Sequence, residues 1–355
     1  MNKRIEYIDA MRGFTMLLVV YSHIQAIGYD TIYIPSINQA LITFRMPLFF
    51  FISGYILYKA SRIWDWDTTI TFLKKKFKIQ ILPTIFFFTA YMVLFRLEFI
   101  NSIFHENVLQ GYWFTISLFE YFFIYSIYMF LLCNNKHKII YGCFLSIFAY
   151  VLAKATNSPS INNIVTPELT NVLLLDKLKY YVFFFFGTIT RQYIETFTKI
   201  TDKKVFITFI ILIFFFNILY LTKFISIFSN NNLIKALISN FIFITNGFSG
   251  IIITFTIFRK NADSFSESNK YAKCLQFIGR RTLDIYMLHY FFLPRHINMI
   301  GKWFIQHPNP TIEFFFSMSL AILVVILSLS TSYILRLSPF LAHHLFGARI
   351  NKKNE

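Results

Sequence analysis

Three residue types that can bind and transfer chemical groups occur at helical spacing near the start of the chain: Asp9, Arg12 and His23. At 100° per residue, Arg12 and His23 lie about 20° apart on one helix face and roughly 16 Å apart along its axis. Asp9 lies on the same face, one turn before Arg12. Arginine binds phosphate in a fixed fork, and imidazole can accept a proton near neutral pH. The stripe therefore suits a substrate with a phosphate at one end and a reactive group at the other.

Coenzyme A has this form, since a long arm of comparable length joins its phosphorylated nucleotide to a thioester. The competing interpretation is structural: His23 is a hydrogen-bonded core histidine, and Arg12 only anchors the helix at the cytoplasmic edge. For His23 alone both interpretations stay open. For the stripe as a set we favour a functional one, because ionisable residues inside a membrane helix are costly.

The composition explains where such a stripe would lie. Hydrophobic residues make up 56% of the 355 residues and charged residues 14%, against about 45–50% and about 25% in soluble domains. A helix needs about 20 apolar residues to cross a bilayer. We therefore expect an all-α polytopic membrane protein: about ten transmembrane helices in a single domain over residues 1–355, without a sizeable soluble domain. We place the spans at 12–29, 37–58, 80–100, 112–132, 138–155, 178–195, 205–222, 234–258, 278–300 and 313–337.

The net charge of +17 is distributed asymmetrically over these spans. With both termini cytoplasmic, 25 of the 34 Lys and Arg residues lie on the cytoplasmic side, as the positive-inside rule requires. Loops 59–79 and 259–277 are then cytoplasmic, and 156–177 and 223–233 are external. The charge thus sets topology and attracts anionic membrane lipids, so we expect no nucleic-acid partner. Within 59–79 we expect an amphipathic helix lying on the membrane through Trp64, Trp66, Phe72 and Phe77.

Several site types find no support in the sequence. The three cysteines Cys133, Cys143 and Cys274 lie near the predicted cytoplasmic side, so no disulfide is expected. Neither a metal-ligand spacing nor a phosphate-binding loop is evident, and we expect no metal. The first span has the basic start of a signal peptide, but the charged stripe inside it argues for a retained helix.

Further ionisable residues fall within the spans or at their mouths. Arg45 could bind a carboxylate or sugar oxygens on the acceptor side, or could snorkel to the outer interface. Glu120 could orient His23, bind the acceptor, or pair with an arginine such as Arg45 or Arg96. His289 could bind the acceptor or acyl group, or be a core histidine bonded to Tyr286 or to backbone.

Three other residues are candidates by type and position. Trp113 could stack on a sugar ring or belong to the interfacial aromatic belt. Arg280 and Arg281 lie at the cytoplasmic mouth, where the coenzyme A phosphates would arrive, but each alone could be a topology anchor.

Several of these residues belong to segments that resemble one known family. The first span looks like the signature of the membrane acyltransferase 3 family. In that signature ten residues separate Arg12 from His23, Tyr-Ile-Asp precedes Arg12, and Gly13 follows it directly. Segment 45–54 (Arg-Met-Pro-Leu-Phe-Phe-Phe-Ile-Ser-Gly) resembles the family's second span. Pro83, 113–119 and 279–289 resemble later segments in the expected order, so the resemblance covers residues 4–340.

The resemblance implies a ten-helix protein that moves acyl groups, often acetyl, from cytoplasmic acyl-coenzyme A to hydroxyls on saccharides or envelope lipids. By that resemblance His23 is the catalytic histidine, and Arg12, with Asp9, helps to hold coenzyme A. Arg45 departs from the histidine that frequently precedes Met-Pro in the family, which leaves its role open. We expect the stand-alone form, without a fused extracytoplasmic domain.

From this resemblance we expect a multi-pass O-acyltransferase of the cell (inner) membrane. If the acyl group is acetyl, the enzyme is an O-acetyltransferase. Its expected partners are acetyl-coenzyme A, a glycan or lipid-linked saccharide acceptor, and membrane lipids. Direct attack of the acceptor with His23 as base and a covalent acyl relay are both open. Two other classes compete: a transporter or flippase of lipid-linked saccharide, which also needs buried polar residues, and a non-catalytic partner of a glycan-assembly complex.

Overall fold

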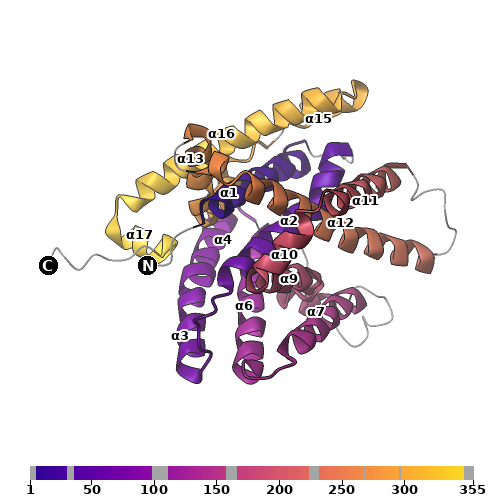
Figure 1. Ribbon diagram of the computed structural model, residues 1–355. Helices are drawn as coiled ribbons and strands as arrows, with labels where there is room; N and C mark the ends of the chain where they lie inside the picture. The colour runs from indigo at the N-terminus through magenta and orange to yellow at the C-terminus, as the bar shows by residue number, and fades with distance from the viewer. Residues whose placement is uncertain are drawn as a thin grey trace. The chain divides into compact units, whose positions relative to one another are not determined.

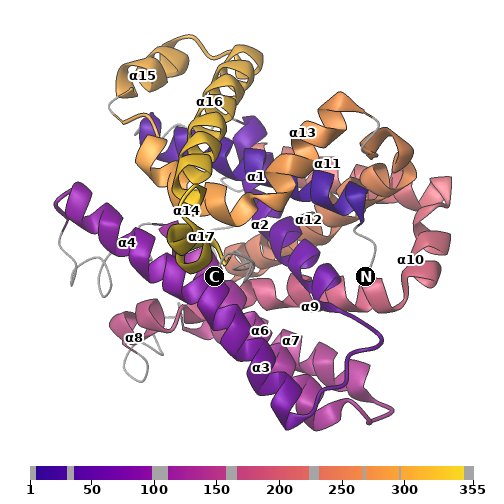
Figure 2. The same ribbon diagram turned by 90° about the vertical axis from the view of Figure 1, so that its left-hand side faces the viewer.

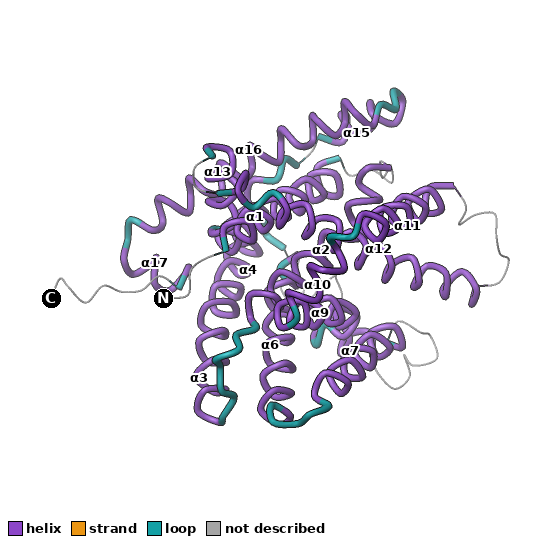
Figure 3. Tube along the Cα trace, viewed as in Figure 1, coloured by secondary structure: helices purple, strands orange, loops and turns teal. Residues whose placement is uncertain are grey.

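A computed structural model describes residues 5–29, 36–97, 111–156, 166–223, 232–266, 269–295 and 297–347. Within these ranges every regular element is a helix, which confirms the predicted all-α class (Figures 1 and 3). The chain divides into two compact units: residues 1–53 with 193–329, and residues 54–192 with 330–355. The single domain stays a prediction.

The α-helices of the two units can be followed by label in Figures 1 and 2. The first unit holds α1 (Glu6–His23), η1 (Ile24–Gly28), most of α2 (Ser36–Leu57), α10 (Ile194–Thr201), α11 (Lys204–Lys223), α12 (Asn232–Lys260), η5 (Asp263–Phe265), α13 (Lys270–Arg280), α14 (Thr282–Phe292), α15 (Asn298–Gln306) and most of α16 (Pro310–Arg336). The second unit holds α3 (Trp66–Lys76), η2 (Phe77–Ile81), α4 (Leu82–Leu94), α6 (Trp113–Leu132), α7 (Lys138–Ala155), α8 (Pro167–Val172), η4 (Leu175–Tyr180), α9 (Tyr181–Gln192) and α17 (Pro339–Phe346).

Six helices among the described residues are long and apolar enough to cross a membrane, so this is a multi-pass membrane protein. They are Ile37–Leu57, Trp66–Leu94, Trp113–Leu132, Lys138–Ala155, Lys235–Lys260 and Pro310–Arg336. Lys204–Leu219 is a shorter apolar helix. The count of ten spans stays a prediction.

The helix α7 shows how the sequence suits lipid. Its buried residues are all small, and they repeat along one face: Gly142, Ser146, Ala149 and Ala153. Its large apolar residues are exposed on the other side: Ile140, Phe144, Ile147, Phe148 and Val151. A soluble helix would place these groups the other way round, whereas membrane helices use small residues for close packing and present large ones to lipid. The ring of Phe185 occupies the space beside Gly142.

Two predicted spans are discontinuous helices. Residues 178–195 are divided between η4, α9 and α10, with a break at Tyr193. Residues 278–300 are divided between α13, α14 and α15, with breaks at Arg281 and after Phe292. The α14 helix has 11 residues, so it rises about 16 Å and cannot cross a hydrocarbon core of about 30 Å alone. Broken helices occur in membrane proteins where the chain lines a binding site.

The basic segment after α2 differs from the expectation of a separate surface helix. Asp65 caps the start of α3 by accepting a hydrogen bond from the Thr68 N–H at 2.7 Å. From there α3, η2 and α4 form one continuous helix (Figure 2). Phe72 and Phe77 contact Phe122 and Phe119 of α6. The aromatic side of this segment therefore packs on a neighbouring helix, because helix–helix contact offers those rings more burial than the membrane surface would.

In the first unit, α1 packs against α12, α13 and α14. The closest approach joins α1 to α13 through two glycines. A Cβ atom added at Gly13 would overlap the Leu275 carbonyl oxygen, and one added at Gly279 would overlap the Asp9 carbonyl oxygen. Only glycine at both positions allows the two backbones to touch. This contact sets the position of α1 against the α13–α14 junction, where the candidate residues lie.

Candidate active site

His23 is the last α-helical residue of α1, and it meets a second histidine. Its Nδ1 atom lies 2.9 Å from Nε2 of His289 on α14. The two rings are stacked, with centroids 5.2 Å apart and an interplanar angle of 12°. His289 is fully buried, whereas His23 keeps part of its surface exposed. The pair therefore consists of an enclosed partner and a reachable imidazole.

The backbone of α14 sets the tautomers of the pair. Nδ1 of His289 lies 3.0 Å from the Ile285 carbonyl oxygen and 2.9 Å from that of Tyr286. Carbonyls only accept hydrogen bonds, so His289 Nδ1 carries a proton, and Nε2 of the neutral ring is an acceptor. His23 Nδ1–H then donates to His289 Nε2. The Nε2 atom of His23 is left with its lone pair, which is the form that a general base needs.

A short π-helix, η1, begins directly after His23. Wide turns of this kind are rare and are found frequently at functional sites. The ring of Tyr290 also contacts His23, with centroids 5.3 Å apart. The last turn of α1 is therefore shaped by its neighbours rather than by helix propensity alone, and His23 sits at the change of helix type.

Arg45 turns toward α1. Its Nη1 donates to the Val19 carbonyl oxygen at 3.3 Å, one turn before His23. The guanidinium is close enough to interact electrostatically with the His23 ring. The Arg45 side chain is thus held against a neighbouring helix, and the interpretations left open from sequence stay predictions. A permanent cation accompanies the candidate base.

Arg12 lies toward the other end of the same helix, at the α13–α14 junction. Its Nη2 donates to Thr282 Oγ1 at 2.8 Å, and its Nη1 lies 3.8 Å from Asp9 Oδ1. The Arg12 side chain is 29% exposed, so it can still meet a ligand. Asp9 therefore acts on Arg12, and a direct contact between the Asp9 carboxylate and a phosphate would be repulsive.

Arg280 and Arg281 directly precede Thr282, the residue that Arg12 binds. Arg281 Nη1 lies 3.4 Å from Asp284 Oδ2, and Arg280 Nη1 lies 3.4 Å from Gln276 Oε1. The break between α13 and α14 at Arg281 thus gathers guanidinium groups from two segments far apart in sequence. Such a group of forked donors fits the several phosphates of a nucleotide donor.

Trp113 and Glu120 belong to the second unit, and their neighbours lie there. Trp113 stacks on Tyr180, with centroids 5.8 Å apart, and the Lys177 ammonium lies 5.3 Å from the Trp113 ring centroid. Glu120 interacts electrostatically with Asp176, which itself pairs with Lys177 at 2.5 Å. Glu120 Oε2 is buried without a hydrogen-bond partner among the described residues. These aromatic and acidic groups form one cluster near η4.

A buried polar cluster beside His23 was missed from sequence. Gln25 Nε2 donates to Tyr21 OH at 2.9 Å and to Glu313 Oε1 at 3.4 Å. Tyr29 OH lies 2.6 Å from Ser317 Oγ. Glu313 is only 1% exposed, yet hydropathy places it at the first residue of a predicted span, where a carboxylate would be solvated. The four-residue spacing of Tyr21, Gln25 and Tyr29 places these polar side chains on one helix face, and this pattern could have predicted the cluster.

A family model described as an acyltransferase domain, that of the acyltransferase 3 family, matches residues 5–334. The chain belongs to the acyltransferase 3 family. It is a membrane acyltransferase, as the resemblance of its motifs predicted. Searches of curated proteins and of solved structures find no match.

In this acyltransferase the two ends of α1 have different chemistry. One end carries an oriented imidazole with a neighbouring cation, and the other carries guanidinium groups at a helix break. The residues matched by the family include α1, α13 and α14 in full. Acyl transfer needs a base at the attacking hydroxyl and binding groups for the donor, and an imidazole and guanidinium groups have the chemistry for these two tasks.

Proposed function

We propose that this acyltransferase moves an acetyl group from cytoplasmic acetyl-coenzyme A to a hydroxyl of a cell-surface or lipid-linked polysaccharide. The observation that carries the proposal is the 2.9 Å contact between His23 and His289, on a helix whose other end holds Arg12 beside Thr282. The acyl-transfer activity is inferred from the family, and the role of each residue is inferred from the contacts described above.

His23 acts as the general base. Its Nε2 takes the proton of the acceptor hydroxyl while the hydroxyl oxygen attacks the thioester carbonyl carbon. The C–S bond then breaks, the thiolate of coenzyme A leaves, and His23 returns the proton to that sulfur. The products are an O-acyl ester and the free thiol of coenzyme A. His289 holds the His23 ring in the required tautomer throughout, as an acceptor for Nδ1–H.

Arg45 supplies positive charge where the carbonyl oxygen becomes an oxyanion. Its guanidinium is held to α1 one turn before His23 and offers further N–H donors. A fixed cation or donor in a site that excludes water stabilises such charge strongly. This role accounts for an arginine inside a span at a position where a histidine is frequent in the family.

The donor phosphates bind at the opposite end of α1. Arg12, Arg280 and Arg281 form the phosphate-binding group, and Asp9 orients Arg12. The helix rise of roughly 16 Å between Arg12 and His23 matches an extended pantetheine arm. In the second unit, Trp113 and Glu120 stay candidates for saccharide binding, since an aromatic face and a carboxylate are groups that sugars need.

The finer topology belongs to the same proposal: ten spans in one transmembrane domain, both termini cytoplasmic, in the inner membrane. Asp202 accepts a hydrogen bond from Arg259 and lies 3.4 Å from Lys260. This ion pair supports the placement of the two predicted loops that contain these residues on the same side of the membrane. Impermeant thiol labelling of single cysteines in intact cells tests it; labelling within 59–79 without permeabilisation contradicts it.

The decisive experiment compares surface glycans of cells with and without the protein by mass spectrometry. Loss of an acetyl mass in cells that lack the protein, and in cells with His23→Gln at normal membrane levels, supports the enzyme. Transport of a lipid-linked saccharide by purified protein without an acyl donor, with glycan acetylation unchanged, would instead identify a flippase.

A further inference from the structure

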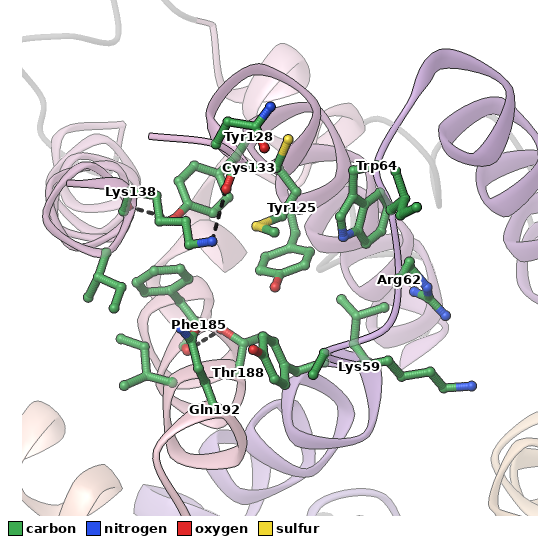
Figure 4. Close-up of a pocket in the computed structure, with 18 residues that line it drawn as sticks. Lys59, Arg62, Trp64, Tyr125, Tyr128, Cys133, Lys138, Phe185, Thr188 and Gln192 are labelled. Atoms are coloured by element: carbon green, nitrogen blue, oxygen red, sulfur yellow. Dashed lines mark hydrogen bonds between the residues drawn. The ribbon is translucent and has the colours of Figure 1, made fainter. Parts of the chain in front are cut away.

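The ends of four helices in the second unit enclose a cavity of about 240 Å³ (Figure 4). Its wall is formed by residues at the ends of α2, α6 and α9, at the start of α7, and in the segment 58–64 that follows α2. In the predicted topology all four of these helix ends are cytoplasmic. The cavity is therefore a pocket at the inner membrane surface, formed without any residue of the His23 pair.

The wall of this pocket is basic. It contains Lys59, Arg62 and Lys138, and none of the residues that line it is an Asp or Glu. Charges gathered in a half-enclosed space reinforce one another, because the low-dielectric wall screens them poorly. The pocket therefore favours an anion.

Lys138 lies inside the pocket. Figure 4 shows its ammonium and the Tyr125 hydroxyl directed toward the interior. Lys138 Nζ donates to the Cys133 carbonyl oxygen at 2.9 Å, which neutralises the C-terminal end of α6 and leaves two further N–H donors. Lys138 is also the first residue of α7, whose N-cap residue His137 makes no side-chain cap. The positive end of that helix adds to the charge.

Arg62 lies on the rim and is fixed there by two rings. Its guanidinium carbon lies 5.2 Å from the Trp64 ring centroid and 5.0 Å from that of Phe72. The Nη1 atom is buried and has no hydrogen-bond partner among the described residues. A guanidinium held in place with a donor unused is suited to an anionic oxygen.

The surroundings of the pocket are apolar. Ile63 in its wall is 76% exposed. Leu131 and Ile140, on two of the helices that form the wall, are 68% and 52% exposed. Ile140 begins the lipid-facing side of α7. A ligand with its charge in the pocket would thus have apolar surface next to it, as a phospholipid requires.

We propose that this pocket binds a phosphate ester group, carried by an anionic phospholipid of the cytoplasmic leaflet. The phosphate oxygens accept from Lys138 and Tyr125 in the interior, with Lys59 and Arg62 at the rim, and the acyl chains lie along the apolar side of α7. The pocket shares no residue with the proposed acyl-transfer site. The inference rests on the proposed topology and not on the proposed acyl transfer.

Thermal unfolding of the purified full chain in neutral detergent tests the proposal. Added phosphatidylglycerol should raise the unfolding temperature, and phosphatidylcholine should not. Inorganic phosphate and glycerol phosphate are run in parallel. Stabilisation by these soluble compounds without an effect of phosphatidylglycerol would keep the phosphate site but overturn the lipid as its carrier.

Lys138→Gln removes the charge inside the pocket, and Lys136→Gln is its matched control, because Lys136 is exposed in the same turn and does not line the pocket. Native mass spectrometry measures bound phosphatidylglycerol per chain. Lys138→Gln should weaken binding about fivefold, and Lys136→Gln should leave it unchanged.

If Lys138→Gln fails to fold, Tyr125→Phe serves instead. Equal binding by wild type, Lys138→Gln and Tyr125→Phe overturns the proposal, as does an equal effect of Lys136→Gln.

Discussion

His23 Nδ1 and His289 Nε2 lie 2.9 Å apart although 266 positions separate the residues in the chain. The geometry of this pair depends on two backbone carbonyls of α14, which assign the proton of His289. The role usually given to a carboxylate beside a catalytic histidine, holding its tautomer, is here performed by a neutral ring. Its advantage in a membrane helix is that no second buried charge has to be compensated.

His23→Gln should remove acyl transfer while the protein still inserts and binds acetyl-coenzyme A. Glutamine keeps hydrogen-bonding capacity but cannot take up the hydroxyl proton, so turnover should fall by about 10²–10⁴-fold. The measurement is acyl transfer per folded molecule in the purified variant, alongside donor binding. Near-normal turnover would exclude His23 as the base. Parallel loss of folding and donor binding would indicate a structural histidine.

His289→Leu should slow turnover about 10- to 100-fold, because His23 loses the acceptor that fixes its tautomer. His289→Gln should restore part of the rate, since its amide oxygen can accept from His23 Nδ1–H. Both the rate and its dependence on pH are measured at saturating donor. A purely structural role would give two variants with lower unfolding temperatures and an unchanged pH profile.

Arg12→Lys should raise KM for acetyl-coenzyme A more than it lowers kcat. Lysine keeps the charge but loses the planar fork, and the residue lies roughly 16 Å of helix rise away from the chemistry. Steady-state kinetics and direct donor binding measure the two effects. Lys273→Gln, at an exposed position of α13, is the control and should change neither. Wild-type donor affinity in Arg12→Ala would disprove the phosphate-binding role.

Gly279→Ala should destabilise the first unit by about 1–3 kcal/mol, as overpacking of a tight contact does. The new methyl would meet the Asp9 carbonyl oxygen, which is backbone and cannot rotate away. Thermal unfolding in detergent measures the effect. Cys274→Ala on the exposed side of the same helix is the control and should be close to neutral. An unfolding temperature equal to wild type would mean that the helices separate freely.

Lowering the pH should weaken the ion pair of Asp202. The hydrogen bond and charge of Arg259, together with Lys260, hold the pKa of this carboxyl below its ordinary value of 3.8. Because the pKa of the Asp202 carboxyl is lower in the folded chain than in the unfolded chain, the ion pair stabilises the fold at pH values above the unfolded pKa. This stabilisation is lost as the pH falls through the folded pKa. The pair is half exposed, so its contribution is below about 1 kcal/mol. Asp202→Asn should reduce the unfolding temperature slightly at pH 7 and remove this acid-dependent part.

The helical stripe was predictable because α1 is one unbroken helix, so the periodicity of Arg12 and His23 holds over its whole length. The partner of His23 was not predictable, since the contact joins helices that are distant in sequence. Hydropathy also averages over breaks, and it therefore reads α13, α14 and α15 as part of one span. The His289 ring is held by the Ile285 and Tyr286 carbonyl oxygens of its own helix.

The basic segment shows the opposite limitation. Lys74, Lys75 and Lys76 lower the local hydropathy, so the sequence predicted a separate surface helix there, yet α3 continues through η2 into α4. Lysine is a good helix former, and its charge can be accommodated by a neighbouring ring, as Lys76 lies 4.0 Å from the Phe122 ring centroid. The pocket at the four helix ends likewise depends on packing between helices, which no local pattern encodes.

The contact of Gly13 with Gly279 has a consequence for biogenesis. The helix α1 is among the first segments to leave the ribosome, and α13 and α14 are among the later ones. Until those later segments are inserted, His23 lacks His289 and Arg12 lacks Thr282, and both side chains must be kept from lipid by water, by the insertion machinery or by earlier helices. The pair of His23 and His289 thus forms late in synthesis, and a chain that stops before α13 contains the proposed base but cannot orient it.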